Sequence, residues 1–209
     1  EKVGVDFSFY KPATIIRRLE KRISINQISK IENYISFLGQ SPNEARILYK
    51  ELLIGVTQFF RDQDAFNIMQ EKVIPEIFKS KQGGGPIRVW SVGCSTGEEA
   101  YSLAILFREY MDENKLDLDV KVFATDLDSE SIEYASTGIY PESIISDVLL
   151  DRLKGYFLKR ESSYIVHERI RRMVIFAAHN ILKDPPFTKL DLVVCRNMLS
   201  YLNSAMQRR

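Results

Sequence analysis

The sequence contains few of the residues that usually carry covalent catalysis or bind metals. It has two cysteines and two histidines among 209 residues. Cys94 and Cys195 form neither a disulfide framework nor a metal-ligand pattern, which indicates a reducing compartment and predicts no metal. With two histidines and no neighbouring Ser/His/Asp pattern, acid–base and acyl-enzyme chemistries lack the side chains that they require.

Long hydrophobic runs are missing as well. The longest charge-free apolar stretch, Met173 to Leu182, is far shorter than the roughly 20 residues that a transmembrane helix needs. The beginning of the chain does not have the order of basic, apolar and small residues that marks a secretory leader. We therefore expect a soluble, cytoplasmic protein. The missing initiator Met and the ending at Arg209 predict a piece of a longer chain.

The formal net charge is only +1, so the overall balance indicates no partner. Charge is less even between Lys11 and Lys30, where six basic residues accompany one acidic residue, Glu20. A solvated helix face is the simplest explanation of such a run. The helical pattern places four of these basic side chains mostly outside its apolar face: Arg17, Arg18, Lys21 and Arg22.

The first eighty residues have helical periodicity. Thr14 is the predicted N-cap of a first helix, and Gly39 is the predicted end of a second. Ser41-Pro42-Asn43-Glu44 predicts the start of a third, with an N-cap, a proline at the first position and a glutamate that closes a capping box. The apolar positions of the helices are Ile16, Leu19 and Ile23; Ile31, Tyr34, Ile35 and Leu38; Ala45, Leu48, Tyr49, Leu52 and Val56; and, in a fourth helix, Phe66, Met69, Val73 and Ile77.

Beyond the break at Gly83-Gly84-Gly85-Pro86, apolar runs of strand length alternate with helical segments. The runs are Ile87 to Val92, Lys121 to Ala124, Met173 to Ala178 and Leu190 to Cys195. Near-continuous apolar strands joined through helices predict a parallel sheet that is covered on both faces. Between Gly155 and Arg172 the pattern instead predicts a small antiparallel hairpin.

The first predicted strand runs into the turn Gly93-Cys94-Ser95-Thr96-Gly97, where a helix begins. Small residues let the backbone approach a ligand closely, and the helix supplies free N–H groups. Two carboxylates follow, Glu98 and Glu99. Acidic residues at a helix N-terminus are favourable in themselves, but they repel a pyrophosphate and tolerate a cationic cofactor. This turn therefore favours a sulfonium over NAD or ATP.

Polar residues follow the other predicted strands too. Asp126 comes after the second strand, where ribose hydroxyls are held in Rossmann-like sheets, and Asp128 is the predicted cap of the next helix. The third and fourth strands end in His179-Asn180 and Cys195-Arg196-Asn197, and His179 is read as a structural residue. Asp184-Pro185-Pro186-Phe187 resembles the signature of adenine-amino methyltransferases, but it precedes the fourth strand, so we interpret it as a turn and expect no nucleic acid.

Together these pieces resemble the chemotaxis receptor methyltransferases, the CheR family, over essentially the whole chain. The matching stretches are Leu52 to Asp62, Arg88 to Ser102, Val122 to Asp128 and Leu192 to Asn197. The resemblance implies transfer of a methyl group from S-adenosylmethionine to receptor glutamates, giving glutamate methyl esters and S-adenosylhomocysteine. It also implies that the basic first helices face the helices of a chemoreceptor.

The resemblance implies the roles of individual residues. In this family the threonine and arginine of the Thr-x-Phe-Phe-Arg segment contact the cofactor, and a tyrosine lies near the methyl-transfer site. The implied cofactor-binding residues are Thr57, Arg61, Gly93, Glu98, Glu99, Asp126, Asn180, Ile181, Arg196 and Asn197, and the implied catalytic residues are Arg61 and Tyr201. Because a glutamate carboxylate is already anionic, attack on a sulfonium methyl needs no general base, and orientation supplies much of the catalysis.

The expected fold is an α/β Rossmann-like class I methyltransferase sheet after a small all-helical domain, with a small antiparallel β insert. The predicted domains are 1–55 (helical, receptor-docking), 56–85 (cofactor segment and linker helix) and 86–209 (methyltransferase, with the insert at 155–172). In this chain Ala100 replaces the proline of the family's Gly-Glu-Glu-Pro-Tyr-Ser motif. The family's domain continues with another helix and further strands beyond the position of Asn203, so we expect a C-terminally truncated sheet with an exposed edge.

Two alternatives stay open. The first is an S-adenosylmethionine-dependent methyltransferase that acts on a substrate other than a receptor glutamate. The second is a non-catalytic S-adenosylmethionine-binding or receptor-docking module of a multidomain signalling protein. The segment Phe9-Tyr10-Lys11-Pro12, with Arg17-Arg18 after it, is similar to versions that are fused to other signalling domains.

Overall fold

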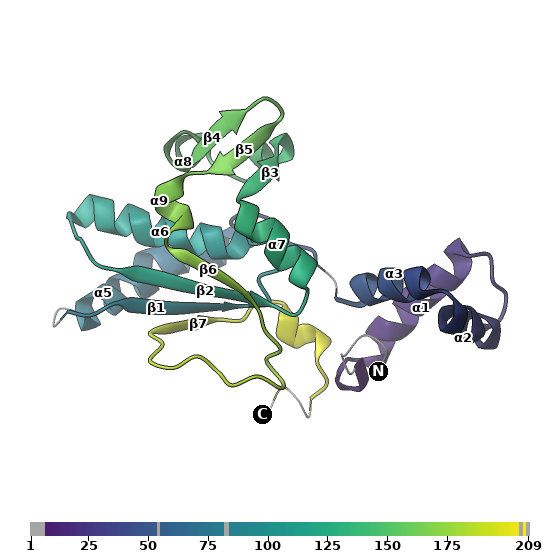
Figure 1. Cartoon of the computed structure of the whole chain (residues 1–209). Coiled ribbons are helices and arrows are strands. Elements are labelled where there is room, and N and C mark those ends of the chain that lie inside the picture. Colours follow the sequence, from purple (N-terminus) through teal and green to yellow (C-terminus); the bar gives the residue numbers. More distant parts are fainter. Residues whose placement is uncertain (1–6, 54, 82–83, 205–206, 208–209) are drawn as a thin grey trace. The chain divides into compact units, whose positions relative to one another are not determined.

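The computed structural model describes residues 7–53, 55–81, 84–204 and 207 (Figure 1). The chain divides into two compact units. Residues 1–55 and 196–209 form the first, here called the helical unit, and residues 56–195 form the second, the sheet unit. The expected fold class is confirmed: helices are followed by a parallel α/β sheet and a small antiparallel sheet.

The helical unit contains α1 (Pro12–Ile25), α2 (Ile31–Gln40) and α3 (Pro42–Leu53), preceded by the 3₁₀ turn η1 (Phe7–Phe9). Its core consists of Tyr34, Leu48 and Leu52, with side chains of α1 and α2 packed around them. The later turn η4 (Met198–Tyr201) joins this unit, since the Lys11 N–H donates to the Tyr201 carbonyl at 2.9 Å.

The exact apolar faces of α1 and α2 differ from the prediction. α1 begins at Pro12 after Lys11 rather than at Thr14, and Ile15 packs on the core while Ile16 is 51% exposed. In α2, Ile31 and Ile35 are exposed, and Phe37 packs beside Tyr34 and Leu38, in a helix that ends at Gln40 rather than at Gly39. A stripe of period 3.6 is wide enough that neighbouring rows compete for the core. The pattern therefore located the helices and placed Leu19, Ile23, Tyr34 and Leu38 correctly, but it misplaced the edge of each apolar face.

Arg22 is the clearest correction in this unit, because it was expected outside the apolar face. It is 8% exposed and pairs with Glu44 of α3, from Nε to Oε1 at 2.8 Å and from Nη2 to Oε2 at 2.6 Å. The Tyr34 hydroxyl donates to the same carboxylate at 2.8 Å. The predicted start of α3 is confirmed, with the Glu44 N–H donating to Ser41 Oγ, but the Glu44 side chain turns inward to Arg22. Arg22 is therefore an interior residue and not part of a docking surface.

The sheet unit begins with one bent helical run. α4 (Gln63–Ile68), the π-helical turn η2 (Met69–Val73) and α5 (Ile74–Ser80) follow one another directly. The predicted inward positions are confirmed, because Phe66 and Ile77 are buried and Met69 and Val73 pack against the core. The π turn interrupts the helical period, a deviation that the residue pattern alone does not reveal.

A parallel sheet in the order β6-β2-β1-β7 forms the centre of the unit. The strands are β1 (Ile87–Val92), β2 (Val120–Asp126), β6 (Val174–Ala178) and β7 (Leu192–Val194), and the helices between them are α6 (Glu98–Asn114) and α7 (Ser129–Thr137). All four predicted runs form strands. The order places β7 at the edge of the described sheet.

The two faces of the sheet are packed differently. Val89 and Val122 are paired in register and fully buried in the main core with residues of α6. Trp90 and Phe123 occupy the next position on the opposite face, where the ring of Phe187 packs on both. Val193 on this face remains 52% exposed. The prediction of two covered faces required a helix on this second face. In the described part of the chain, the segment after β6 packs there instead.

The small sheet has the order β3-β5-β4 and is antiparallel (Figure 1). The predicted hairpin is confirmed as β4 (Phe157–Arg160) and β5 (Ser163–Val166), and the prediction missed β3 (Ile139–Pro141), which pairs with β5. The turn η3 (Glu142–Ser146), α8 (Leu150–Tyr156) and α9 (Glu168–Arg171) accompany it. We call residues 139–171 the small-sheet region.

Asp128 caps α7 as predicted, since its carboxylate accepts the Glu130 N–H at 3.1 Å and the Ser131 hydroxyl at 2.8 Å. Loss of an N-cap costs about 1 kcal/mol. We expect Asp128→Ala to lower the free energy of unfolding by about that amount, measured by urea denaturation followed through the fluorescence of Trp90. Asp128→Ser keeps a capping oxygen and is expected to recover most of the loss. Equal stability of all three proteins would contradict the capping role.

Candidate functional site

The turn between β1 and α6 is built from a backbone that only small residues tolerate. Gly93 and Gly97 have φ angles of 71° and 93°, and Ser95 between them has φ 49°. A Cβ atom on Gly97 would lie 2.8 Å from the Cβ of Ala135 and 3.1 Å from the ring of Phe176. The turn is held to β2, because the N–H groups of Gly93 and Cys94 both donate to the Thr125 carbonyl. Glycine at position 97 is therefore required by both dihedral angle and space.

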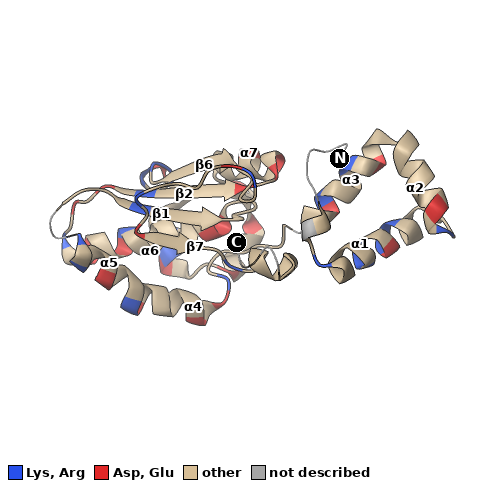
Figure 2. Ribbon diagram, turned by 90° about the horizontal axis from the view of Figure 1, so that it is seen from below, with Lys and Arg blue, Asp and Glu red and all other residues tan. Residues whose placement is uncertain are grey.

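The structure brings together the three predicted acidic residues at the carboxyl ends of β1 and β2 (Figure 2). The Thr96 hydroxyl donates to the Glu98 carboxylate at 2.7 Å, and the Ser91 hydroxyl donates to Glu99 Oε1 at 2.9 Å. Asp126 accepts the Ser95 N–H at 2.7 Å through Oδ2 and the Asp128 N–H at 3.0 Å through Oδ1. The carboxylates are thus oriented by neighbouring hydroxyl and amide groups.

Burial raises pKa values in this acidic group. It raises the pKa of Glu98, against the opposing effect of the Thr96 hydroxyl, and it also raises the pKa of Asp126. Burial, together with the charges of Asp126 and Glu99, raises the pKa of the Cys94 thiol well above its usual value. A positively charged ligand would relieve the cost of holding these carboxylates together in a partly buried place. A phosphate would increase it.

One buried polar atom in this turn has no hydrogen-bond partner among the described residues, the Ser95 hydroxyl oxygen. Buried polar groups without partners are rare in native proteins and require an explanation, such as contact with a bound ligand or water. The Ser95 hydroxyl, the close-packed glycine turn and the acidic residues together form a site that fits a cationic nucleoside-like ligand. The sequence pattern did not single out Ser91, Thr96 or Tyr140. The Tyr140 hydroxyl donates to the Thr96 carbonyl at 2.7 Å. The only signal in the sequence was a hydroxyl residue within the glycine turn.

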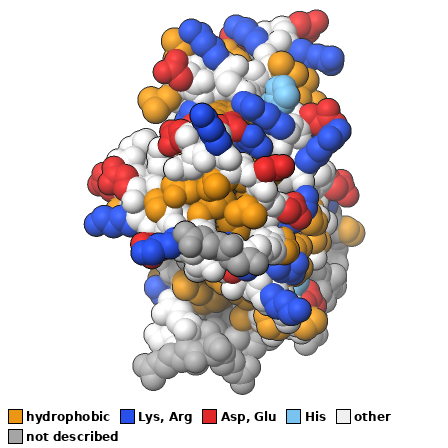
Figure 3. All heavy atoms as spheres, turned by 90° about the vertical axis from the view of Figure 1, so that its left-hand side faces the viewer, with side chains coloured by type: hydrophobic (Ala, Val, Ile, Leu, Met, Phe, Trp, Pro, Cys, Tyr) orange, Lys and Arg blue, Asp and Glu red, His pale blue; other side chains and the backbone are white. Residues whose placement is uncertain are grey.

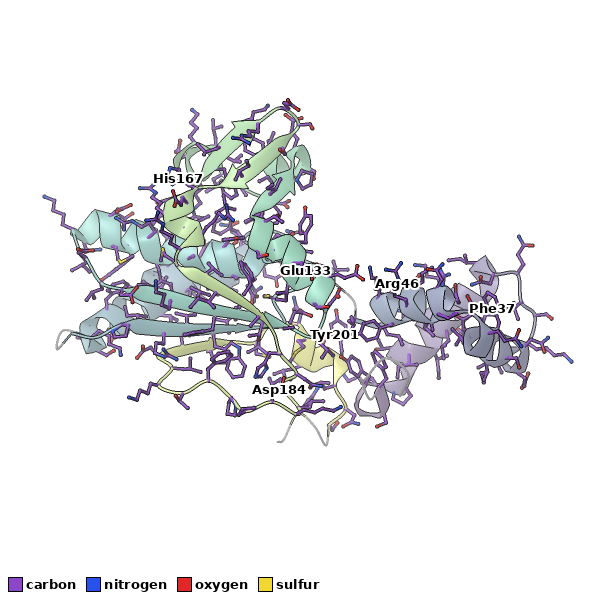
Figure 4. All side chains as sticks on the ribbon, in the orientation of Figure 1. Phe37, Arg46, Glu133, His167, Asp184 and Tyr201 are labelled. Carbon is purple, nitrogen blue, oxygen red and sulfur yellow. The ribbon has the colours of Figure 1, made fainter. Side chains whose placement is uncertain are left out.

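The segment after β6 completes this edge of the sheet. The His179 N–H donates to the Asp126 carbonyl, so Asn180 follows directly on the strand beside β2. Asn180 Oδ1 accepts the Leu182 N–H at 3.0 Å, and the Asn180 N–H donates to Asp184, labelled in Figure 4. Ile181 is 39% exposed. These contacts make 180–184 a closed turn, and Phe187 packs on the sheet beside the His179 ring. This turn precedes the Asp-Pro-Pro-Phe motif and ends at its first residue, and Pro185 to Phe187 continue as irregular chain rather than as the predicted turn.

The segment 56–62, here called the cofactor segment, is irregular and lies between α3 and α4. Phe59 and Phe60 are buried, while Thr57 and Arg61 on either side are half-buried. Arg61 Nη1 donates to the Val56 carbonyl at 2.7 Å, which closes the segment on itself. Phe60 N–H donates to the Ser102 hydroxyl of α6 at 3.0 Å. The segment is therefore tied to the helix that starts at the glycine turn.

The remaining predicted site residues lie in the helical unit. Arg196 and Asn197 belong to the residues that pack with the N-terminal helices, and Tyr201 is in η4 (Figure 4). Asn197 has φ 62°, a conformation that asparagine adopts more readily than most residues. The sheet unit contains eight of the predicted cofactor-binding residues: Thr57, Arg61, Gly93, Glu98, Glu99, Asp126, Asn180 and Ile181.

Comparison with known proteins decides between the ligands that this geometry allows. Residues 55–209 match the model of the CheR methyltransferase SAM-binding domain, and residues 1–53 match the CheR methyltransferase all-alpha domain. The chain belongs to the CheR methyltransferase family. The predicted cofactor, S-adenosylmethionine, is thereby confirmed, and its sulfonium agrees with the acidic turn.

The relatives of this CheR chain include proteins of which it covers about three quarters and one much longer protein. It is 32% identical over 208 residues to a chemotaxis protein methyltransferase of Borreliella burgdorferi, covering 96% of this chain and 73% of the relative. It is 29% identical over 215 residues to chemotaxis protein methyltransferase 2 of Vibrio cholerae, covering all of this chain and 74% of the relative. An uncharacterized 104.1 kDa protein of Rhodobacter capsulatus is 41% identical over 205 residues, 98% of this chain but only 22% of that protein.

None of the helices in the described ranges of the CheR chain is long and apolar enough to cross a membrane.

Proposed function

We propose that this CheR chain transfers the methyl group of S-adenosylmethionine to glutamate side chains of cytoplasmic chemoreceptor helices, giving glutamate methyl esters and S-adenosylhomocysteine. The observation that carries the proposal is the group of Glu98, Glu99 and Asp126 at a glycine turn of a CheR SAM-binding domain. S-adenosylmethionine supplies an electrophilic methyl group, and a receptor glutamate, anionic near neutral pH, accepts it without a general base.

In this proposal the protein binds the cofactor and orients the acceptor carboxylate toward its methyl group. Asp126 is assigned to the ribose hydroxyls, and Glu98 or Glu99 to the cationic side of the cofactor. Thr57 and Arg61 of the cofactor segment, and Asn180 and Ile181 after β6, are assigned to the cofactor as well. Arg196, Asn197 and Tyr201 are assigned to the cofactor and to the incoming carboxylate.

Domain roles follow the same proposal. Residues 1–55 dock on the receptor, 56–85 supply the cofactor segment and its helix, and 86–209 form the methyltransferase domain. The docking residues are Arg17, Arg18 and Lys21, without Arg22. α1 carries several basic residues (Figure 2), which suits an acidic helical partner. Reaction on such a partner places the protein in the cytoplasm.

Arg61 provides the direct test of the cofactor assignment. We expect Arg61→Ala to weaken S-adenosylhomocysteine binding by about tenfold to a hundredfold, because hydrogen bonds from charged groups contribute about 1.5 to 3 kcal/mol. Isothermal titration calorimetry measures the affinity, and thermal unfolding shows whether the variant is folded. Arg160→Ala, at the exposed end of strand β4 in the small sheet, is the matched control and should bind as the wild type does. Unchanged affinity and methyl transfer in Arg61→Ala would remove Arg61 from the site.

The acceptor is tested by transfer of radiolabelled methyl groups to receptor fragments, nucleic acid and small molecules, using the full-length protein that contains this chain. Label that is base-labile and confined to receptor fragments supports glutamate esters. Cofactor binding without transfer to any of them would favour the alternative, a binding module within a signalling protein such as the long Rhodobacter relative.

A further inference from the structure

Phe60 occupies a conformation that its surroundings must hold in place. Its φ angle is 50°, and Asp62 two residues later has φ 59°. Non-glycine residues adopt such angles only where neighbouring groups over-determine them, and these residues cluster at functional sites. Phe60 is 4% exposed, so its ring is enclosed by protein. The groups around this ring therefore decide the path of the cofactor segment.

Arg152 of α8 is the charged group on that ring. Its guanidinium carbon lies 4.3 Å from the centroid of the Phe60 ring, which is the geometry of a cation–π contact. Phe66 of α4 lies edge-on to Phe60 at 5.5 Å. Arg152 is 9% exposed, whereas Lys159 and Arg169 of the small-sheet region are exposed. Figure 3 shows basic and acidic side chains interspersed on the face of the molecule that it draws.

The orientation of Arg152 is fixed by two further elements. Nε and Nη2 donate to the two carboxylate oxygens of Glu109 on α6, at 2.9 and 2.8 Å. Nη2 also donates to the amide oxygen of Gln70 at 3.1 Å, and Gln70 lies in the π turn η2. Such turns occur frequently at functional sites. A two-point pair with a planar guanidinium leaves it little freedom to rotate, so the face presented to Phe60 is set.

Phe59 makes the complementary contact with the same region. Its ring lies edge-on to Tyr140 of β3 at 4.8 Å and to Phe157 of β4 at 5.4 Å. Tyr140 in turn donates to the Thr96 carbonyl of the glycine turn. The two phenylalanines of the cofactor segment are therefore both seated on the small-sheet region, Phe59 through aromatic rings and Phe60 through Arg152.

We propose that Arg152 is a positioning residue for S-adenosylmethionine binding. Held by its pair with Glu109, it fixes the Phe60 ring and with it the backbone of the neighbouring residues Thr57 and Arg61. The small-sheet region thereby sets the geometry of the cofactor segment. This inference rests on the proposed assignment of that segment to the cofactor.

The test is calorimetric titration of the full chain with S-adenosylhomocysteine. Arg152→Met keeps the length of the side chain but removes the charge, and we expect about tenfold weaker binding. Phe60→Leu is expected to weaken binding by a similar factor. The double variant should bind no more weakly than either single variant, because the two changes break one contact. A role confined to stability would not produce this non-additivity, and Arg152→Lys, which keeps the charge, supplies a milder variant if Arg152→Met does not fold.

Arg169→Met is the matched control. Arg169 also belongs to the small-sheet region, stacks on an aromatic ring, Tyr156, at 4.9 Å and pairs with an acidic residue of α6, Asp112. Its partners among the described residues are Tyr156, Asp112 and the Gly155 carbonyl, which all lie outside the cofactor segment, so its loss should change the affinity less than twofold. Wild-type affinity in folded Arg152→Met, or equal weakening in Arg169→Met, would overturn the positioning role alone. A wild-type chain that does not bind S-adenosylhomocysteine would overturn the proposed function with it.

Discussion

Glu44→Ala is expected to lower the free energy of unfolding of the helical unit by about 3 to 5 kcal/mol, because it leaves the buried guanidinium of Arg22 without its main partner. The side chains of Arg22 and Glu44 are 10% and 6% exposed, and Glu51 reaches Arg22 only at 3.4 Å. The substitution also removes the acceptor of the buried Tyr34 hydroxyl. Urea denaturation followed by far-UV circular dichroism measures the change.

Two further variants separate the buried pair from ordinary charge effects. Glu76→Ala breaks the Lys79–Glu76 pair, whose side chains are 71% and 74% exposed, and should change the free energy of unfolding by less than about 0.5 kcal/mol. The double variant Arg22→Met/Glu44→Leu removes both buried charges and should recover part of the loss. A Glu44→Ala protein as stable as the Glu76→Ala protein would show that the pair does not hold α1 against α3.

The same pair predicts how the helical unit responds to acid. The hydrogen bonds and charge of Arg22 lower the pKa of Glu44 below the value of about 4.3 that it has in an unfolded chain. The unfolded chain therefore takes up the proton first as the pH falls. The stabilisation is fully present above pH 4.3 and is lost as the pH falls through the lower pKa of the folded state. In Glu44→Gln, the dependence of unfolding on pH in this range should be reduced.

Arg22 also shows where interpretation of the sequence ends. Helical periodicity identified α1, α2 and α3, because that signal depends on neighbours in the chain. Whether Arg22 faces solvent or Glu44 depends on a contact between α1 and α3, made by two residues 22 positions apart in the chain. Helical periodicity carries no information about such a contact. For the same reason β3 was missed, since a strand of three residues acquires its structure from pairing with β5.

The acidic turn was more predictable than the contacts that support it. Parallel strands place their carboxyl ends at one edge, so Glu98, Glu99 and Asp126 were expected together once the runs at 87–92 and 121–124 were predicted to be parallel strands. The capping role of Asp128 was also predictable, because an N-cap contacts the residues that directly follow it in the chain. In contrast, Arg152 lies in the sequence far from Phe60, and its contact with the ring arises from the fold of the small-sheet region. Cofactor residues assigned by resemblance, such as Asn197, remain predictions.

Gly97→Ala is expected to cost the sheet unit about 3 kcal/mol and to weaken S-adenosylhomocysteine binding about a hundredfold. The stability loss combines a φ angle of 93° with a Cβ that would lie 2.8 Å from Ala135, and strain or overpacking of this kind costs about 1 to 3 kcal/mol each. The affinity loss follows because the turn must shift, and a displacement on the order of 1 Å at a positioned site costs that much. Unfolding is followed by Trp90 fluorescence and binding by calorimetry.

Gly155→Ala is the matched control for Gly97→Ala in the same unit. Gly155 lies in α8, and a Cβ there would meet nothing within 4 Å. Alanine is favoured over glycine in a helix, so this variant should be as stable as the wild type or up to about 1 kcal/mol more stable, with unchanged affinity. The contrast between the two glycines isolates the close approach of the β1–α6 turn to α7 and β6. A Gly97→Ala protein that unfolds and binds like Gly155→Ala would mean that the turn is not the rigid element on which cofactor binding depends.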